Sequence, residues 1–236
     1  MKKWMARLAL TLGLMCLGLG IMLSGFEWAT ASGDAYWNLQ KRLETPLVSE
    51  FPEAVRAADW VCADYLFARR DDLALDGETQ AALGGFTQRE IDHMVDVRAL
   101  FALERQVCRW AMAGAVALIV VGWALARGRR GEEAVRACRR CAFLWAGLLA
   151  VGALAVAVDF ESAFLTFHHL LFTNDLWLLS AQDLLIRLYP ESFFAGMALR
   201  IGVFMLGGLV LVYLAVGLLA RKIARRFDRG GNPNAV

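Results

Sequence analysis

The sequence contains little histidine, little cysteine and almost no net charge: 3 His and 5 Cys occur in 236 residues, and 25 Lys+Arg stand against 23 Asp+Glu. A formal charge of +2 on a chain of this length excludes a polybasic nucleic-acid-binding protein. Cys138 and Cys141 have CxxC spacing, but no second pair and no nearby histidine complete the roughly four ligands of a zinc site. No serine or cysteine lies in a recognisable nucleophile motif. We therefore expect no nucleic-acid partner, no bound metal and no cofactor.

Hydrophobic residues are abundant instead. They make up 58% of the chain, above the roughly 45–50% that is usual in soluble domains. They gather in four stretches, at residues 8–26, 108–126, 141–158 and 201–220, each close to the about 20 residues that a helix needs to cross the hydrocarbon core of a bilayer. No histidine lies in these stretches, which argues against a haem held by two histidines across the helices. The composition predicts an all-α polytopic membrane protein with four transmembrane helices.

The charges outside the four stretches predict the orientation, because Lys and Arg in short flanking segments stay on the cytoplasmic side of a membrane. Residues 1–7, 127–140 and 221–236 are basic, through Lys2, Lys3, Arg7, Arg127, Arg129, Arg130, Arg136, Arg139, Arg140, Arg221, Lys222, Arg225, Arg226 and Arg229. Residues 27–107 carry 8 basic and 15 acidic residues, and residues 159–200 carry 2 and 5. We predict that both termini are cytoplasmic and that the two acidic segments are structured and extracytoplasmic.

The first stretch has an alternative interpretation. Lys2 and Lys3, an apolar run and Ala29-Thr30-Ala31 also match a signal peptide with a cleavage site of the A-x-A type. The run is longer than the usual 7–15 residues of such a peptide, which favours a retained helix. Cleavage would leave three spans and would not change the exposure of either acidic segment.

The first acidic segment contains two predicted helices. Between residues 53 and 69, apolar side chains recur at the i, i+3, i+7, i+10 and i+11 positions of an amphipathic helix, at Val55, Ala58, Cys62, Tyr65 and Leu66. A loop with Asp76-Gly77 and Gly84-Gly85 follows. Thr87-Gln88-Arg89-Glu90 then matches a capping box, in which the threonine and glutamate side chains bind free N–H groups at the start of a helix that runs toward the second stretch.

His93 and Asp96 lie on this second helix, three residues apart and so on one face. The carboxylate is placed to orient the imidazole and to stabilise its charged form, as in a catalytic His-Asp pair. The same spacing is also typical of a solvated pair on a helix surface, which contributes about 0.2–0.5 kcal/mol. On the residues alone both interpretations stay open.

The second acidic segment combines aromatic and polar residues. Between Phe164 and Trp177 it is too polar to cross a membrane and too apolar for a solvated loop. We predict an interfacial helix or a re-entrant segment at the level of the lipid headgroups. At helical spacing His168, Phe172 and Asp175 share one face, where polar groups can converge on a cavity. Ionisable groups at membrane depth are costly, which makes them candidates for function.

Two motifs in this order resemble the bacterial lipoprotein intramolecular transacylases (Lit). The first is Phe86-Thr87-x-Arg89-Glu90-Ile91-x-His93-Met94-x-Asp96-Val97, and the second is Phe167-His168-x-x-Leu171-Phe172-x-Asn174-Asp175-x-Trp177, followed by Asp183-x-Leu185-Ile186 and Pro190. The four-span layout is similar over nearly the whole chain. After Trp177, Ser180-Ala181 stands where the family pattern has Asp-Pro.

The resemblance implies an enzyme of the bacterial cytoplasmic membrane that retains its first span and whose active site faces the extracytoplasmic side. Such an enzyme moves the sn-2 acyl chain of a diacylglyceryl-cysteine lipoprotein to the α-amino group of the same cysteine, which gives the lyso-form. Diacylglyceryl-modified lipoproteins and membrane phospholipid are its partners. The resemblance implies a catalytic role for His168, His93, Asp96 and Asn174. Substrate contacts are expected from residues around them, which are Phe172, Asp175, Trp177, His169 and Asp183.

Transfer of an acyl group from oxygen to nitrogen needs a neutral amine, a base for its proton, an acid for the leaving alkoxide and a donor to the oxyanion. One histidine can be base and acid, a second histidine oriented by Asp96 can polarise the carbonyl, and Asn174 can be the oxyanion donor. Two alternatives stay open. One is an acyl hydrolase acting on membrane lipid or lipoprotein, and the other is a non-catalytic assembly protein whose acidic segment binds a partner.

Overall fold

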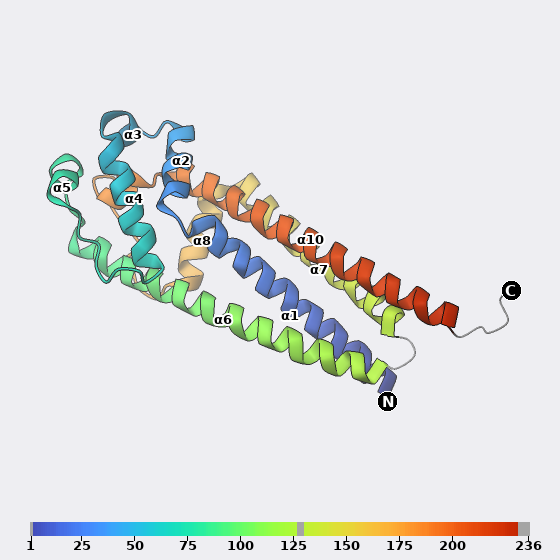
Figure 1. Ribbon diagram of the computed structural model, residues 1–236. Coiled ribbons are helices and arrows are strands. Elements are labelled where there is room, and N and C mark those ends of the chain that lie inside the picture. Colours follow the sequence, from blue (N-terminus) through green and yellow to red (C-terminus); the bar gives the residue numbers. More distant parts are fainter. Residues whose placement is uncertain (1, 127–129, 231–236) are drawn as a thin grey trace. The chain divides into compact units, whose positions relative to one another are not determined.

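The computed structural model describes residues 2–126 and 130–230, and these residues form helices and no strand, as the composition predicts (Figure 1). In chain order the helices are α1 (Lys2–Thr30), α2 (Gly33–Leu43), α3 (Pro46–Glu50), α4 (Pro52–Leu66), α5 (Gly77–Leu83), α6 (Gln88–Ala126), α7 (Arg130–Val158), α8 (Phe160–Leu171), α9 (Leu184–Leu188) and α10 (Glu191–Gly230). Two basic residues of the predicted 127–140 connection, Arg127 and Arg129, lie outside the described residues.

The chain divides into two compact units. Unit 1 consists of residues 1–25, 106–151 and 204–236, and unit 2 consists of residues 26–105 and 152–203. Both acidic segments of the sequence fall almost entirely into unit 2.

Four helices, α1, α6, α7 and α10, are long and apolar enough to cross a membrane. Each contains one of the four predicted stretches and extends beyond it. The predicted helix after the capping box and the second apolar stretch are one helix, because α6 runs through 39 residues without a break. Large apolar side chains such as Val116, Leu148 and Leu211 are exposed on these helices, as expected for surfaces that face lipid chains.

Unit 1 packs its helices closely around a buried cluster. A Cβ at Gly13 of α1 would lie 2.9 Å from the backbone nitrogen of Ile119, so glycine allows α1 to approach α6 at this point. The two CxxC cysteines are buried in the cluster, where the Sγ atoms of Cys138 and Cys141 lie 3.3 and 3.5 Å from backbone carbonyl oxygens. All five cysteines are free thiols.

The core of unit 2 is built around α4. All five residues of its predicted apolar stripe are buried, and α4 contacts α2, α3 and α5. The helix ends at Leu66 rather than at residue 69, because Ala68 takes a left-handed backbone conformation with φ of 55°. The predicted loop that follows contains α5, so that expectation was wrong: the Asp76 carboxylate accepts from the N–H of Thr79 at 2.8 Å and caps a helix instead of closing a turn.

A buried polar network ties the elements of unit 2 together. Asp59 of α4 is fully buried, and its Oδ1 accepts from Gln40 Nε2 at 2.8 Å and from the Tyr189 hydroxyl at 3.0 Å. Burial raises the pKa of Asp59 to about 8, so this carboxyl group is mainly protonated at neutral pH. Because Gln40 lies on α2 and Tyr189 ends α9, the network fixes the chain just before α10.

Candidate active site

The capping box at the start of α6 forms as predicted. The N–H of Thr87 donates to Glu90 Oε2 at 2.6 Å, and the N–H of Glu90 donates to Thr87 Oγ1 at 3.3 Å. Glu90 is fully buried, and its second oxygen, Oε1, accepts from the N–H of Leu185 at 2.7 Å in the first turn of α9. One carboxylate therefore joins the starts of two helices that are far apart in the sequence.

His93 lies one turn beyond Glu90 on α6, and His168 lies in the last turn of α8. Their ring centroids are 6.3 Å apart, and each side chain is only 9% exposed. The Phe172 ring contacts both histidines, with centroid distances of 5.3 Å to His93 and 5.7 Å to His168. The two histidines of the two sequence motifs thus come together in unit 2.

The hydrogen bonding of His168 fixes its tautomer. Its Nδ1 lies 2.8 Å from the backbone carbonyl oxygen of Phe164. A carbonyl oxygen only accepts, so Nδ1 carries the proton and Nε2 carries the lone pair. Burial lowers the pKa of His168, more strongly than the bond to Phe164 raises it, and the neighbouring His169 also lowers it. His168 is therefore a neutral imidazole with Nε2 available as a base.

Aromatic side chains surround His168. The centroid of the Phe164 ring is 4.1 Å from that of His168, and the Trp177 ring is 5.0 Å away. His169 is exposed, and its ring meets the Trp177 ring edge-on at a centroid distance of 5.0 Å. The two adjacent histidines consequently have different surroundings, because His168 is buried and His169 is exposed.

Asp96 does not hydrogen-bond to His93, the partner that the sequence spacing indicates. Its Oδ2 accepts from Asn174 Nδ2 at 2.9 Å, and Asn174 Oδ1 accepts from the N–H of Leu176 at 3.0 Å. The buried Nδ1 of His93 has no hydrogen-bond partner within residues 2–126 and 130–230. Asp96 therefore holds the loop that follows α8, and one amide hydrogen of Asn174 is already used in this contact.

The loop after α8 departs from the predicted helical face. The helix ends at Leu171, and Phe172 is extended, so Asp175 does not continue the face of His168. The reason is local, because the Asn174 side chain accepts from a backbone N–H two residues on and stabilises a turn. The backbone carbonyl of Asp175 instead accepts from the Arg89 side chain.

Asp183 forms a hydrogen bond within this loop. Its Oδ2 accepts from the N–H of Ser180 at 2.6 Å, and the residue immediately precedes α9. Arg89 and Glu90 belong to the first sequence motif, but nothing in its spacing indicates these contacts with the loop and with α9. Within the described ranges, no group of three or more His, Cys, Asp or Glu side chains is placed to hold a metal ion.

The family model of the lipoprotein intramolecular transacylase Lit matches residues 9–194. The chain belongs to the Lit family. Membership makes it an acyltransferase and, together with the four apolar helices, a multi-pass protein of the bacterial membrane. Comparison with curated protein sequences finds no match.

Solved structures of the membrane-integral lipoprotein intramolecular transacylase Lit from Bacillus cereus share the fold. One has a TM-score of 0.62 and 21% identity, over 98% of this chain and 95% of that chain. A variant with a histidine replaced by arginine has a TM-score of 0.73 and 23% identity, over 94% and 95%. A variant with a histidine replaced by alanine has a TM-score of 0.62 and 23% identity, over 94% and 93%.

Proposed function

We propose that this protein moves the sn-2 acyl chain of a diacylglyceryl-cysteine lipoprotein to the α-amino group of the same cysteine, at the extracytoplasmic face of the membrane. The observation that carries the proposal is the pairing of His93 and His168, which lie with their rings 6.3 Å apart among aromatic side chains. Each comes from one of the two motifs that resemble the Lit family, and the family model spans both.

His168 is the base and then the acid in this proposal. Its Nε2 accepts a proton from the α-amino nitrogen as that nitrogen bonds to the ester carbonyl carbon. The same proton passes to the sn-2 glyceryl oxygen as the bond between carbon and that oxygen breaks. One N–H bond is lost and one O–H bond is gained, so the reaction needs no co-reactant.

His93 and Asn174 stabilise the oxyanion that forms between these two steps. His93 donates a ring N–H, and Asn174 donates the amide hydrogen that Asp96 leaves free. Asp96 is a positioning residue here, because it orients the Asn174 amide rather than an imidazole. Removal of one such donor typically slows an acyl transfer by about 10²–10³-fold.

The aromatic surroundings favour transfer over hydrolysis. Both reacting groups belong to one lipopeptide, so holding them in contact replaces an encounter in solution. Phe164, Phe172 and Trp177 shield His168 from water, which is the competing nucleophile. The amine must be neutral to attack, and an α-amino group has a pKa of about 7.7–8.0 in water.

The exposed face of α8 suits a site at the membrane surface. Leu170 is 82% exposed and Phe167 is 55% exposed, whereas His168 between them is buried. An amphipathic helix of this kind lies in the interface with its apolar face among the acyl chains. The acidic charge of residues 159–200 and the basic flanks of the spans support an extracytoplasmic position for this helix.

Mass spectrometry of a lipoprotein N-terminal peptide tests the proposal. The protein is expressed in a bacterium that makes diacylglyceryl lipoproteins without N-acylation. We expect a peptide of unchanged total mass in which fragmentation places one acyl chain on nitrogen. Loss of one acyl chain from the total mass would indicate a hydrolase, and an unmodified peptide would indicate a non-catalytic protein.

A further inference from the structure

In unit 1, the carboxylates of Glu132 and Glu133 form ion pairs with two arginines. Glu133 of α7 is 7% exposed, and both of its oxygens accept from the Arg7 guanidinium at 3.0 Å. Arg136 donates to the same residue at 3.0 Å and to Glu132 at 3.3 Å. These contacts satisfy the charges of Arg7 and Arg136 within the protein.

Arg221 and Arg225 of α10 have no such partner. Both are exposed, and neither forms an ion pair with any side chain that the structure describes. They lie four residues apart, so they share one face of α10, where like charges repel. An anion between the two guanidinium groups would remove this repulsion.

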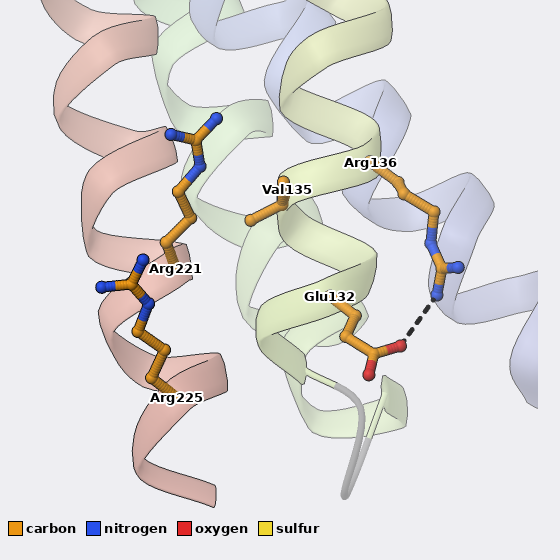
Figure 2. A pocket seen from close by; sticks show the side chains of 5 residues that line it. All are labelled: Glu132, Val135, Arg136, Arg221 and Arg225. Atoms are coloured by element: carbon orange, nitrogen blue, oxygen red, sulfur yellow. Dashed lines mark hydrogen bonds and ion pairs between the residues drawn. The ribbon is translucent and has the colours of Figure 1, made fainter. Parts of the chain in front are cut away.

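A pocket of about 380 Å³ is lined by residues of α7 and α10. It is lined by Glu132, Val135, Arg136, Arg221 and Arg225 (Figure 2). Figure 2 shows Glu132 joined to Arg136, which leaves the two α10 arginines as the unpaired positive charges of the lining. The volume is at the lower end of the range of about 300–1,000 Å³ for small-molecule sites.

We propose that this pocket binds the phosphate group of an anionic phospholipid. Arginine is suited to this ligand because its planar guanidinium donates two parallel hydrogen bonds to phosphate oxygens. Arg221 directly follows the apolar stretch 201–220, which places the pocket at the level of the headgroups rather than in bulk water. Basic pockets between membrane-spanning helices are known to hold anionic headgroups. Val135 adds an apolar side chain to the lining.

Native mass spectrometry with a charge-matched control tests the proposal. The full chain is purified in detergent with equal amounts of phosphatidylglycerol and phosphatidylcholine. We expect the wild type to retain phosphatidylglycerol preferentially and Arg221→Gln/Arg225→Gln to retain it at least fivefold less. The control Arg139→Gln/Arg140→Gln removes the same charge from exposed arginines of α7 that do not line the pocket, and it should retain lipid within twofold of the wild type.

A conservative variant and a competition experiment with inorganic phosphate complete the test. Arg221→Lys/Arg225→Lys keeps the positive charge but replaces the planar guanidinium groups by ammonium groups. We expect its retention of phosphatidylglycerol to lie between that of the wild type and that of Arg221→Gln/Arg225→Gln. Inorganic phosphate should compete only at far higher concentration than the lipid. Equal loss in the two glutamine variants, or no loss in either, would overturn the site. Binding of phosphate without retention of phosphatidylglycerol would overturn the lipid assignment. Circular dichroism and thermal melting of each variant check that folding is unchanged.

Discussion

The two adjacent histidines of α8 are identical side chains that differ in burial and in hydrogen bonding. His168 is buried among rings with its Nδ1 bound to a carbonyl oxygen, whereas His169 is exposed beside Trp177. In the sequence, both are polar residues of the same predicted helical turn. His168 is assigned a catalytic role ahead of His169 because the motif that resembles the Lit family contains His168. The structure distinguishes them by which one faces His93.

The first prediction concerns this pair. His168→Ala should lower acyl transfer by about 10²–10⁴-fold, since it removes the group that takes and returns the proton. His169→Ala should lower it by less than tenfold. Transfer is measured on a diacylglyceryl lipopeptide, with the amount of each variant in the membrane fraction checked by immunoblot. Full activity of His168→Ala at wild-type abundance would remove this residue from the mechanism.

Asp59 carries a second prediction at the residue scale. Burial raises its pKa to about 8, against about 3.9 in an unfolded chain. Between these values the folded protein holds a proton that the unfolded chain releases, so this group makes stability fall as pH rises from about 4 to about 8. Asp59→Asn keeps the oxygen that accepts from Gln40 and Tyr189 but cannot ionise. Its Tm should therefore fall less than that of the wild type between pH 5 and pH 8.5.

Thermal melting in detergent at these two pH values provides the measurement. Glu53→Gln, a change at an exposed acidic residue of the same helix, serves as the control. The same pH dependence in Asp59→Asn and in the wild type would show that other groups determine it.

At the scale of elements, sequence patterns predicted those features that depend on interactions between residues close together in the chain. The apolar stripe of α4 and the capping box of α6 are confirmed, because burial of one face and capping of free N–H groups act within a few residues. The sequence patterns did not predict the end of α8 or the helix α5. Each depends on a single hydrogen bond from a backbone N–H to a side chain, which forms a turn at Asn174 and a helix cap at Asp76. The bond between Glu90 and Leu185 spans 95 residues, and no local pattern encodes it.

This bond leads to a third prediction. Glu90→Gln replaces one carboxylate oxygen by an amide group, so either the partly buried N–H of Thr87 or the buried N–H of Leu185 loses its acceptor. The loss should cost about 1–3 kcal/mol of stability and lower Tm by several degrees. Acyl transfer should also fall, because α9 and the loop before it are held on α6 near His93.

Glu50→Gln is the matched change at an exposed glutamate of α3, and it should leave both Tm and transfer unchanged. A wild-type Tm in Glu90→Gln would show that the double cap does not stabilise the protein.

At the scale of the whole molecule, the small net charge conceals a separation of charges. The basic residues flank the apolar stretches in three groups, and the acidic residues dominate the two segments that form most of unit 2. Composition and charge were sufficient to predict an all-helical membrane protein with four long apolar helices. They could not predict that Asp96 binds Asn174, because pairings between distant segments follow from the packed fold.

Reporter fusions test the orientation as a fourth prediction. Green fluorescent protein fused after residue 236 should fluoresce, and alkaline phosphatase at the same position should be inactive, since the C-terminus is predicted to be cytoplasmic. Alkaline phosphatase inserted at Gly84-Gly85, in the first acidic segment, should be active. The opposite pattern of activities would invert the topology and place both histidines on the cytoplasmic side.

The central claim is that the purified protein moves an acyl chain within one lipopeptide. The most direct measurement uses a synthetic diacylglyceryl-cysteine peptide with an isotopically labelled sn-2 chain, incubated with the wild type and with His168→Ala. We predict that tandem mass spectrometry finds the labelled chain on the cysteine nitrogen, with the total mass unchanged and the His168→Ala product below detection. Release of the labelled chain as free fatty acid, or equal transfer by both proteins, would contradict the account.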